Sequence, residues 1–328
     1  YEIKANHKPI RKKKRNDFKT ILFIVCLLAY PMIQWGVFWL YPNIRTFTLP
    51  FMDWDFWEMK YVFPNPFGFF YNFKMQIKSF LAEGALLKHS LLFNAFFNTF
   101  HSLAINLIIL PIATIIGYAL AKHVPGEKFF RIIFFTPNII STVVMCLVFR
   151  FMLEGNDSLF IGPVTKILRF FGSDFNGWDM QNTKQIWTLV YIYCIWTGLS
   201  INVVLISSAF QRIPSDIVES ARLDGVTFFG EFIKIGVPLI MPTITTFLVN
   251  SVIAVCGFYM QPYLLLSDYG AGGQFATIPW IIFNLTQSAD QSTYIVIATI
   301  GIMFSIIIFP FIMLARFIGR KLTPDVEF

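Results

Sequence analysis

Long apolar segments alternate with short polar stretches along most of this chain of 328 residues. A run of about 20 apolar residues is long enough to cross the hydrocarbon core of a bilayer as a helix. Runs of this order lie at residues 20–41, 98–121, 129–153, 185–210, 240–266 and 293–317. The pattern therefore predicts an all-α polytopic membrane protein with six transmembrane helices. The alternative, a large soluble core, requires short strands or amphipathic helices between polar stretches, which is not the pattern here.

The composition supports membrane insertion. Charged residues make up 14% of the chain, hydrophobic residues make up 56%, and the mean hydropathy is +0.62. Soluble domains carry roughly 25% charged residues. The cysteines lie within apolar runs, without CxxC spacing or a neighbouring histidine, so they predict apolar packing rather than a zinc site or disulfide framework. They are Cys26, Cys146, Cys194 and Cys256.

The spans and the polar stretches divide the chain into parts. The first span is too long for the apolar region of a signal peptide, and no small-x-small cleavage site follows, so we expect a retained anchor. The aromatic-rich excursion after it suits either the lipid headgroup level or a docking surface for an outside partner. The expected parts are a basic segment (1–19), the first span (20–41), the excursion (42–90), a core of five spans (91–317) and a tail (318–328).

The distribution of Lys and Arg predicts the orientation in the membrane. The N-terminal segment, the loops after the second and fourth spans, and the C-terminal tail hold 17 of these residues, whereas the opposite side holds nine. The positive-inside rule places the first set, and both termini, in the cytoplasm. The run RKKKR at residues 11–15 could bind nucleic acid or anionic lipid, but we interpret it as a topology anchor beside membrane lipid, with no nucleic-acid partner.

The spans lack the residues that catalysis or ion coupling requires. Their middles contain no Asp, Glu, Lys or Arg, and His101 is their only histidine. Ion-coupled carriers keep ionisable groups near the midplane, and membrane enzymes need an acid/base pair or a metal cluster. The sequence also lacks a G-x-x-x-x-G-K-[ST] phosphate loop. We therefore expect a transport subunit that is not an enzyme, binds no cofactor or metal, and takes its energy from another protein.

A polar insertion between the fourth and fifth spans, VESARLDGVTFFGEFIKIGVPLIMP at residues 218–242, has the pattern of two short helices. Before it, Pro214 suits a first helical turn, and Ser215 or Asp216 suits an N-cap. Gly225 permits a sharp bend. We expect Thr227 to cap a second helix that ends near Gly236 and Pro238, where the fifth span begins.

This insertion resembles the E-A-A…G…I-x-L-P loop of ABC importer permeases. Ser220 stands where the second Ala is usual, and Val237 replaces Leu. In that family the loop forms a coupling helix that sits in a cleft of a cytoplasmic ATPase. The resemblance therefore implies ATPase contact by this loop, at residues 211–238, with acids that could pair with basic groups on the partner. The coupling residues implied are Glu219, Ser220, Ala221, Asp224, Gly225, Ile235 and Pro238.

The resemblance covers roughly residues 90–320 and is strongest for permeases of the carbohydrate-uptake type. The segment FYMQPYLLLSDYGAGGQFATIPW resembles one of that type, in which Gly272, Gly273 and Thr277 fit. The resemblance implies the six-helix type I importer permease fold in a bacterial plasma membrane. It also implies a second homologous permease, expected as a heterodimer, two ATPase copies that carry ATP and Mg, and an extracytoplasmic solute-binding protein. The expected cargo is an oligosaccharide; a peptide, polyamine or phosphate importer and an ion-coupled carrier are the alternatives.

Polar residues at helical spacing predict where the solute passes. In the fifth span, Thr246, Asn250 and Gln261 belong to a stripe that follows one helix face. Asn250 and Gln261 are the strongest candidates because a buried amide needs a partner. The alternative is that these residues join helices, since small and polar residues are common at membrane helix contacts. The full candidate set is Asn138, Tyr191, Asn202, Thr246, Asn250, Tyr259 and Gln261.

Overall fold

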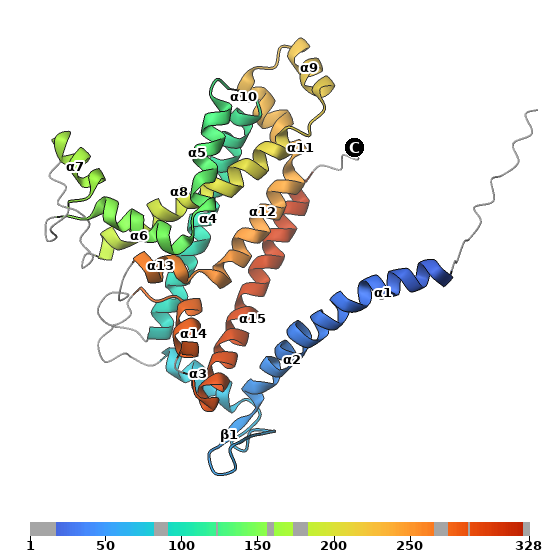
Figure 1. The fold of residues 1–328 in the computed structure, drawn as a ribbon, viewed down its shortest axis with the longest axis vertical. Helices are drawn as coiled ribbons and strands as arrows, with labels where there is room; N and C mark the ends of the chain where they lie inside the picture. The colour runs from blue at the N-terminus through green and yellow to red at the C-terminus, as the bar shows by residue number, and fades with distance from the viewer. Residues whose placement is uncertain are drawn as a thin grey trace, which may run out of the picture.

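The protein is described from a computed structural model. The structure describes residues 18–81, 91–122, 124–155, 161–172, 183–265, 275–287 and 289–323. These residues form an elongated and almost entirely helical bundle, with the short helix α9 at one end and a β-hairpin at the other (Figure 1). Helix α9 spans Ser215–Leu223, and the hairpin strands β1 and β2 span Asp53–Asp55 and Lys60–Val62.

Within the described ranges, four helices are long and apolar enough to cross a membrane. The first, Ile21–Phe51, comprises α1, η1, α2 and η2, and the other three are α4, α8 and α15. A helix of 31 residues is about 46 Å long, which exceeds a hydrocarbon core of about 30 Å. The helical run continues to Phe51, past residue 41, and the boundary between the first span and the excursion (42–90) stays a prediction. Bounds are α1 Phe18–Trp35, η1 Gly36–Leu40, α2 Tyr41–Thr48, η2 Leu49–Phe51, α4 Leu91–Ala121, α8 Thr183–Phe210 and α15 Gln291–Leu322.

The predicted third span is a bent pair of helices. Helices α5 (Glu127–Ile139) and α6 (Thr142–Leu153) meet at an angle of 108°. Between them, Ile140 and Ser141 have ψ angles of 139° and 136°, outside the helical region. Pro137 is a proline inside the predicted span, where a kink is expected, and it lies shortly before this break. It lacks the N–H that would continue the helical hydrogen bonds.

The predicted fifth span (240–266) is also broken, at Phe258, and a further bend lies at its start. The helical run α10–η3–α11 meets α12 at an angle of 71°. The sequence predicts that Gly236 and Pro238 end the second helix of the insertion, but the helix continues through both residues and ends at Leu239. Pro242 then occupies the first turn of α12, where its fixed φ suits a new helix. Bounds are α10 Phe228–Glu231, η3 Phe232–Gly236, α11 Val237–Leu239, α12 Met241–Ala254, η4 Val255–Gly257 and α13 Met260–Leu265.

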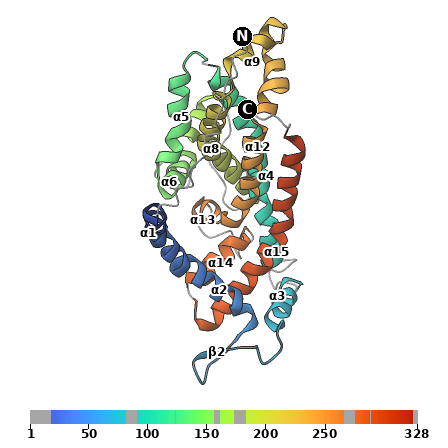
Figure 2. The same ribbon diagram turned by 90° about the vertical axis from the view of Figure 1, so that its right-hand side faces the viewer.

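The excursion after the first span is folded against the bundle at the end opposite α9 (Figure 2). The Tyr61 hydroxyl donates to the side-chain oxygen of Gln291, at 2.7 Å, at the start of α15. Phe51 packs on Phe69 with ring centroids 4.5 Å apart, while Trp57 at the hairpin tip is 96% exposed. The remaining helices are α3 Tyr71–Leu81, α7 Pro163–Phe170 and α14 Ile278–Gln287.

The centre of the bundle is the close packing of α4 against α8. Small residues permit this approach, as is common between membrane helices. A Cβ added at Gly117 would lie 3.0 Å from Ile206 Cγ2 and 3.1 Å from the backbone nitrogen of Ser207. Hydroxyl groups along α4 bond their own helix, since Thr114 Oγ1 donates to the carbonyl oxygen of Leu110 at 2.7 Å. Helices α4 and α8 therefore form a fixed pair on which the broken helices pack.

Replacing Gly117 by Leu is expected to destabilise the α4–α8 pair by about 1–3 kcal/mol, because the added side chain meets backbone that cannot move aside. The matched control is Gly301→Leu on α15, where an added Cβ meets nothing within 4 Å. The thermal midpoint of the detergent-solubilised protein, followed by fluorescence-detected size exclusion, should fall for the first variant only. An equal midpoint in both variants would contradict the close packing.

Candidate functional site

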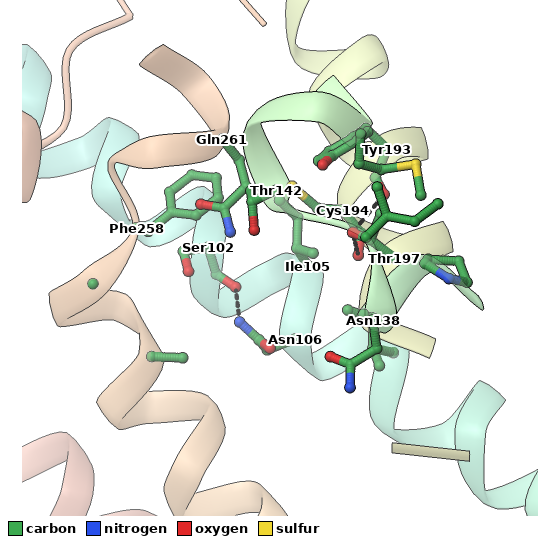
Figure 3. Close-up of a pocket in the computed structure, with 17 residues that line it drawn as sticks. Ser102, Ile105, Asn106, Asn138, Thr142, Tyr193, Cys194, Thr197, Phe258 and Gln261 are labelled. Carbon is green, nitrogen blue, oxygen red and sulfur yellow. Dashed lines mark hydrogen bonds between the residues drawn. The ribbon is translucent and has the colours of Figure 1, made fainter. Parts of the chain in front are cut away.

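A cavity of ≈ 300 Å³ lies among the broken helices and the central pair. It is bounded by α4, the α5–α6 bend, α8, and the junction from α12 to α13 (Figure 3). The bend exposes Asn138 and Thr142 on either side of Ser141, while the break at Phe258 turns Gln261 toward the same space. The two helix breaks therefore place polar side chains where straight spans would have packed together.

The lining of this cavity is polar but carries no charge among the described residues. Asn106 Nδ2 donates to the carbonyl oxygen of Ser102 at 2.9 Å, which leaves its amide oxygen free to accept. The Gln261 Oε1 atom is buried and has no hydrogen-bond partner within the described part of the chain. Tyr193 and Phe258 add aromatic surface. Such a lining can bind a neutral, hydroxyl-rich molecule through hydrogen bonds and ring contacts.

The structure brings together only part of the candidate solute path. Asn138 and Gln261 line the cavity. Asn250 and Thr246 are exposed on α12, so they face lipid or another chain. The expected single stripe along the fifth span is wrong beyond α12, because η4 and Phe258 separate Gln261 from the helix that carries Asn250.

The three other candidates make contacts elsewhere. The Tyr259 ring lies 4.8 Å from the Phe283 ring, between centroids. The Tyr191 hydroxyl lies 3.0 Å from Nδ1 of His101. Asn202 Nδ2 donates to the carbonyl oxygen of Gly198 at 2.6 Å, within α8. None of these three residues lines the cavity, so for them the role in solute passage stays a prediction.

The carbohydrate-type segment after the fifth span is only partly within the described residues. Gly272 and Gly273 lie outside them. Thr277 is fully buried, and its hydroxyl donates to the carbonyl oxygen of Phe258 at 2.8 Å. The Thr99 hydroxyl of α4 in turn accepts from the backbone N–H of Ile278 at 2.9 Å. These two threonines hold the start of α14 against the break that opens the cavity.

The polar insertion forms the second feature of interest, at the end of the bundle distant from the hairpin. Helix α9 follows Pro214, which is the N-cap residue instead of a first-turn residue. Two backbone hydrogen bonds close its C-terminus in a Schellman motif, from Gly225 N to Arg222 O at 3.0 Å and from Val226 N to Ala221 O at 3.1 Å. This closing motif requires a left-handed residue, and Gly225 has a φ of +79°. The predicted bend at Gly225 is confirmed.

The second helix of the insertion begins as predicted, since the Thr227 hydroxyl accepts from the backbone N–H of Gly230 at 3.3 Å. Of the coupling candidates on α9 and its bend, Glu219, Ser220, Asp224 and Gly225 are exposed, whereas Ala221 is buried. Ile235 and Pro238 are half-buried on the continuing helix. Within the described chain, neither Glu219 nor Asp224 pairs with a cation. The exposed side of α9 is therefore acidic and available.

The chain matches, over residues 109–326, the family described as the binding-protein-dependent transport system inner membrane component. The chain belongs to this family. The permease is similar to the sn-glycerol-3-phosphate transport system permease protein UgpA of Shigella dysenteriae, with 26% identity over 72% of this chain and 79% of that protein. It is also similar to the diacetylchitobiose uptake system permease protein NgcF of Streptomyces coelicolor, with 22% identity over 91% of this chain and 84% of that protein.

The same fold occurs in a solved structure, a bacterial ABC transporter involved in the import of the acidic polysaccharide alginate. That structure superposes with a TM-score of 0.75 at 19% identity, covering 94% of this permease and 98% of that chain. The similarity to NgcF extends into the first 89 residues, where the sequence motifs had given no match. The permease is thus a multi-pass membrane protein of an importer family.

Sequence reasoning missed several residues of the permease. Ser102, Asn106 and Thr197 line the cavity. Ser102 and Asn106 lie four residues apart on α4, and this spacing is the signal that could have identified these two. Glu231 was also missed. It is a lone acid in an apolar run, and it is 4% exposed, the only buried charged side chain in the described ranges.

Proposed function

We propose that this permease passes an oligosaccharide through the membrane, driven by a separate ATPase. The observation that carries the proposal is the uncharged polar cavity at the junction of the two broken helices. Its volume lies at the lower end of the range for small-molecule sites, about 300–1,000 Å³. The uptake of diacetylchitobiose named for NgcF and the alginate import named for the solved structure support a saccharide.

The chemistry of the cavity favours a neutral solute over the alternatives. A phosphate, a polyamine or a charged peptide terminus needs an opposite charge when it leaves water. No such charge lines the described cavity, although Tyr193 and Phe258 supply faces for a sugar ring. An ion-coupled carrier also needs ionisable groups at this depth. UgpA is named for a glycerol-3-phosphate transport system, so a phosphorylated solute is the second candidate. A direct binding measurement distinguishes it from a saccharide.

The remaining partners follow from exposed surfaces. Helix α9 offers an acidic, unpaired face that suits a basic cleft of a cytoplasmic ATPase, in two copies for two permeases. The first span has an apolar window that is 0% buried, and it stands apart from the bundle in Figure 1. Such a helix needs lipid or a second permease as its neighbour. An extracytoplasmic binding protein would deliver solute at the hairpin end, with both termini of the permease in the cytoplasm.

Purification from the native membrane in mild detergent tests the assignment. The expected partners, identified by mass, are an ATPase, a second six-span protein and a secreted or lipid-anchored binding protein. The binding protein is then screened against arrays of glycans and against glycerol 3-phosphate. Binding of a glycan supports the proposal, and binding of glycerol 3-phosphate supports the second candidate. Recovery of the permease alone, stable and without an ATPase in several detergents, would contradict the function.

A further inference from the structure

Glu231 lies where the insertion joins the bundle, on α10 and one turn after the capping Thr227. Its carboxylate forms ion pairs with Lys122, which directly follows α4, and with Nε of Arg222 on α9 at 3.4 Å. The Glu231 side chain is 5% exposed, whereas those of Lys122 and Arg222 are 21% and 59% exposed. One buried carboxylate therefore connects a membrane span, the exposed helix and the helix between them.

The surroundings of this carboxylate fix its position. The Tyr118 ring packs against Phe210, Phe228 and Phe232, with centroids 5.2, 5.1 and 4.9 Å away. Lys122 Nζ lies 5.5 Å from the centroid of the Tyr118 ring, so the cation is held over an aromatic face. The ends of α4, α8 and α10 thus meet in one aromatic cluster beneath the ion pairs.

Helix α9, by contrast, is barely packed on the bundle. Ala221 is its one buried residue, and a cavity of ≈ 550 Å³ separates the helix from the ends of α4 and α8. Glu219, Arg222 and Glu231 all line that cavity. The backbone joins α9 to its neighbours at both ends. Among the described residues, the only ion pair that links α9 to another element is that of Arg222 with Glu231.

We propose that Glu231 is a positioning residue for energy coupling, which fixes the orientation of α9 on α4 by holding Arg222 and Lys122 at the same time. The inference rests on the proposed function, because it requires an ATPase that moves α9. A buried carboxylate with two cationic partners resists separation, since removal of one partner leaves an uncompensated charge. Displacement of α9 is then transmitted to α4 through the ion pairs as well as along the backbone, and so to the wall of the solute cavity.

The test uses the complete importer complex in lipid nanodiscs, with the four cysteines of this chain replaced by alanine and Thr142 replaced by cysteine in the cavity wall. Reaction of that cysteine with a membrane-impermeant maleimide is measured with and without trapping by ATP and vanadate. We expect trapping to change the wild-type labelling rate by about fivefold or more, and the Arg222→Gln rate by less than about twofold. ATP hydrolysis and ATPase retention should stay within about twofold of wild type in this variant, because a helix held less firmly still offers its contact face.

Arg222 is exposed, so its replacement should not prevent folding. The matched control is Arg212→Gln, which removes another exposed cation of the same insertion and should leave the labelling response unchanged. A double-mutant cycle with Glu231→Gln and Lys122→Met separates positioning from general stability. If the ion pair acts as a unit, Lys122→Met alone loses as much of the response as Glu231→Gln alone, and the double variant loses no more. Independent structural effects would leave Lys122→Met with a partial response.

The outcomes distinguish the two proposals. If the wild-type permease retains no ATPase, or if trapping does not change its labelling rate, the proposed function fails, and this inference fails with it. If the wild type responds and Arg222→Gln responds equally, or if the cycle is additive, the positioning role alone is wrong. A selective loss of the response in Arg222→Gln and in the Glu231→Gln variant, with hydrolysis retained, establishes the role.

Discussion

Replacement of Gly225 by Glu should leave the permease in the membrane but abolish uptake and weaken retention of the ATPase. The φ of +79° costs a side-chain-bearing residue about 1–2 kcal/mol. A new carboxylate at the C-terminus of α9 is also unfavourable by about 0.3–1 kcal/mol, because the helix dipole is negative there. Because the ATPase contact requires this turn, the cost of forming it reduces the affinity, by roughly tenfold to 100-fold at a factor of ten per 1.4 kcal/mol. Co-purification of the ATPase, and uptake of the solute identified through the binding protein, measure the result.

Gly172 provides a matched control for that variant. It has a φ of +80°, and an added Cβ there also meets nothing within 4 Å, but it follows α7 and is distant from the insertion in sequence. The variant Gly172→Glu introduces the same residue at the same backbone strain. ATPase retention should be normal in this control. Equal loss in both variants would mean that backbone strain alone explains the defect, and wild-type uptake in Gly225→Glu would refute the contact.

Replacement of Gly257 by Trp should block the solute cavity. An added Cβ at this position meets nothing within 4 Å, and the residue lines the cavity, so a large side chain enters the space without displacing backbone. An indole ring there takes up part of the cavity of ≈ 300 Å³. We expect uptake to fall by at least about tenfold, because a loss of about 1.4 kcal/mol of solute-binding free energy lowers the affinity tenfold. ATPase retention should be unaffected, because the cavity and α9 are separate features.

The control for the blocked cavity is Gly301→Trp. Gly301 on α15 likewise has open space around an added Cβ but does not line the cavity. Uptake by this variant should equal that of the wild type at equal membrane content. If Gly257→Trp transports normally, the solute does not pass through this cavity, and the exposed face of α12 with Asn250 becomes the better candidate.

Local signals in the sequence determined the number and position of the apolar segments and the shape of the insertion. An apolar window reports whether a segment can leave water, and a glycine at a required left-handed position or a capping threonine acts through its immediate neighbours. The bend at Gly225 and the cap at Thr227 were therefore predicted correctly. The same locality explains why the resemblance was carried by short segments, above all the loop of the insertion.

Tertiary structure alone decided how far the apolar segments bend and which of their residues come into contact. Hydropathy is nearly the same for a straight span and for one bent by 108°, so Pro137 indicated a kink between α5 and α6 but not its size. The displacement of Gln261 from the Asn250 face had no clear signal. The ion pair of Glu231 with Lys122 joins positions far apart in the chain, although Arg222 lies in the same insertion as Glu231. Sequence periodicity describes one helix at a time, whereas a cavity or a buried ion pair depends on how several helices are oriented against one another.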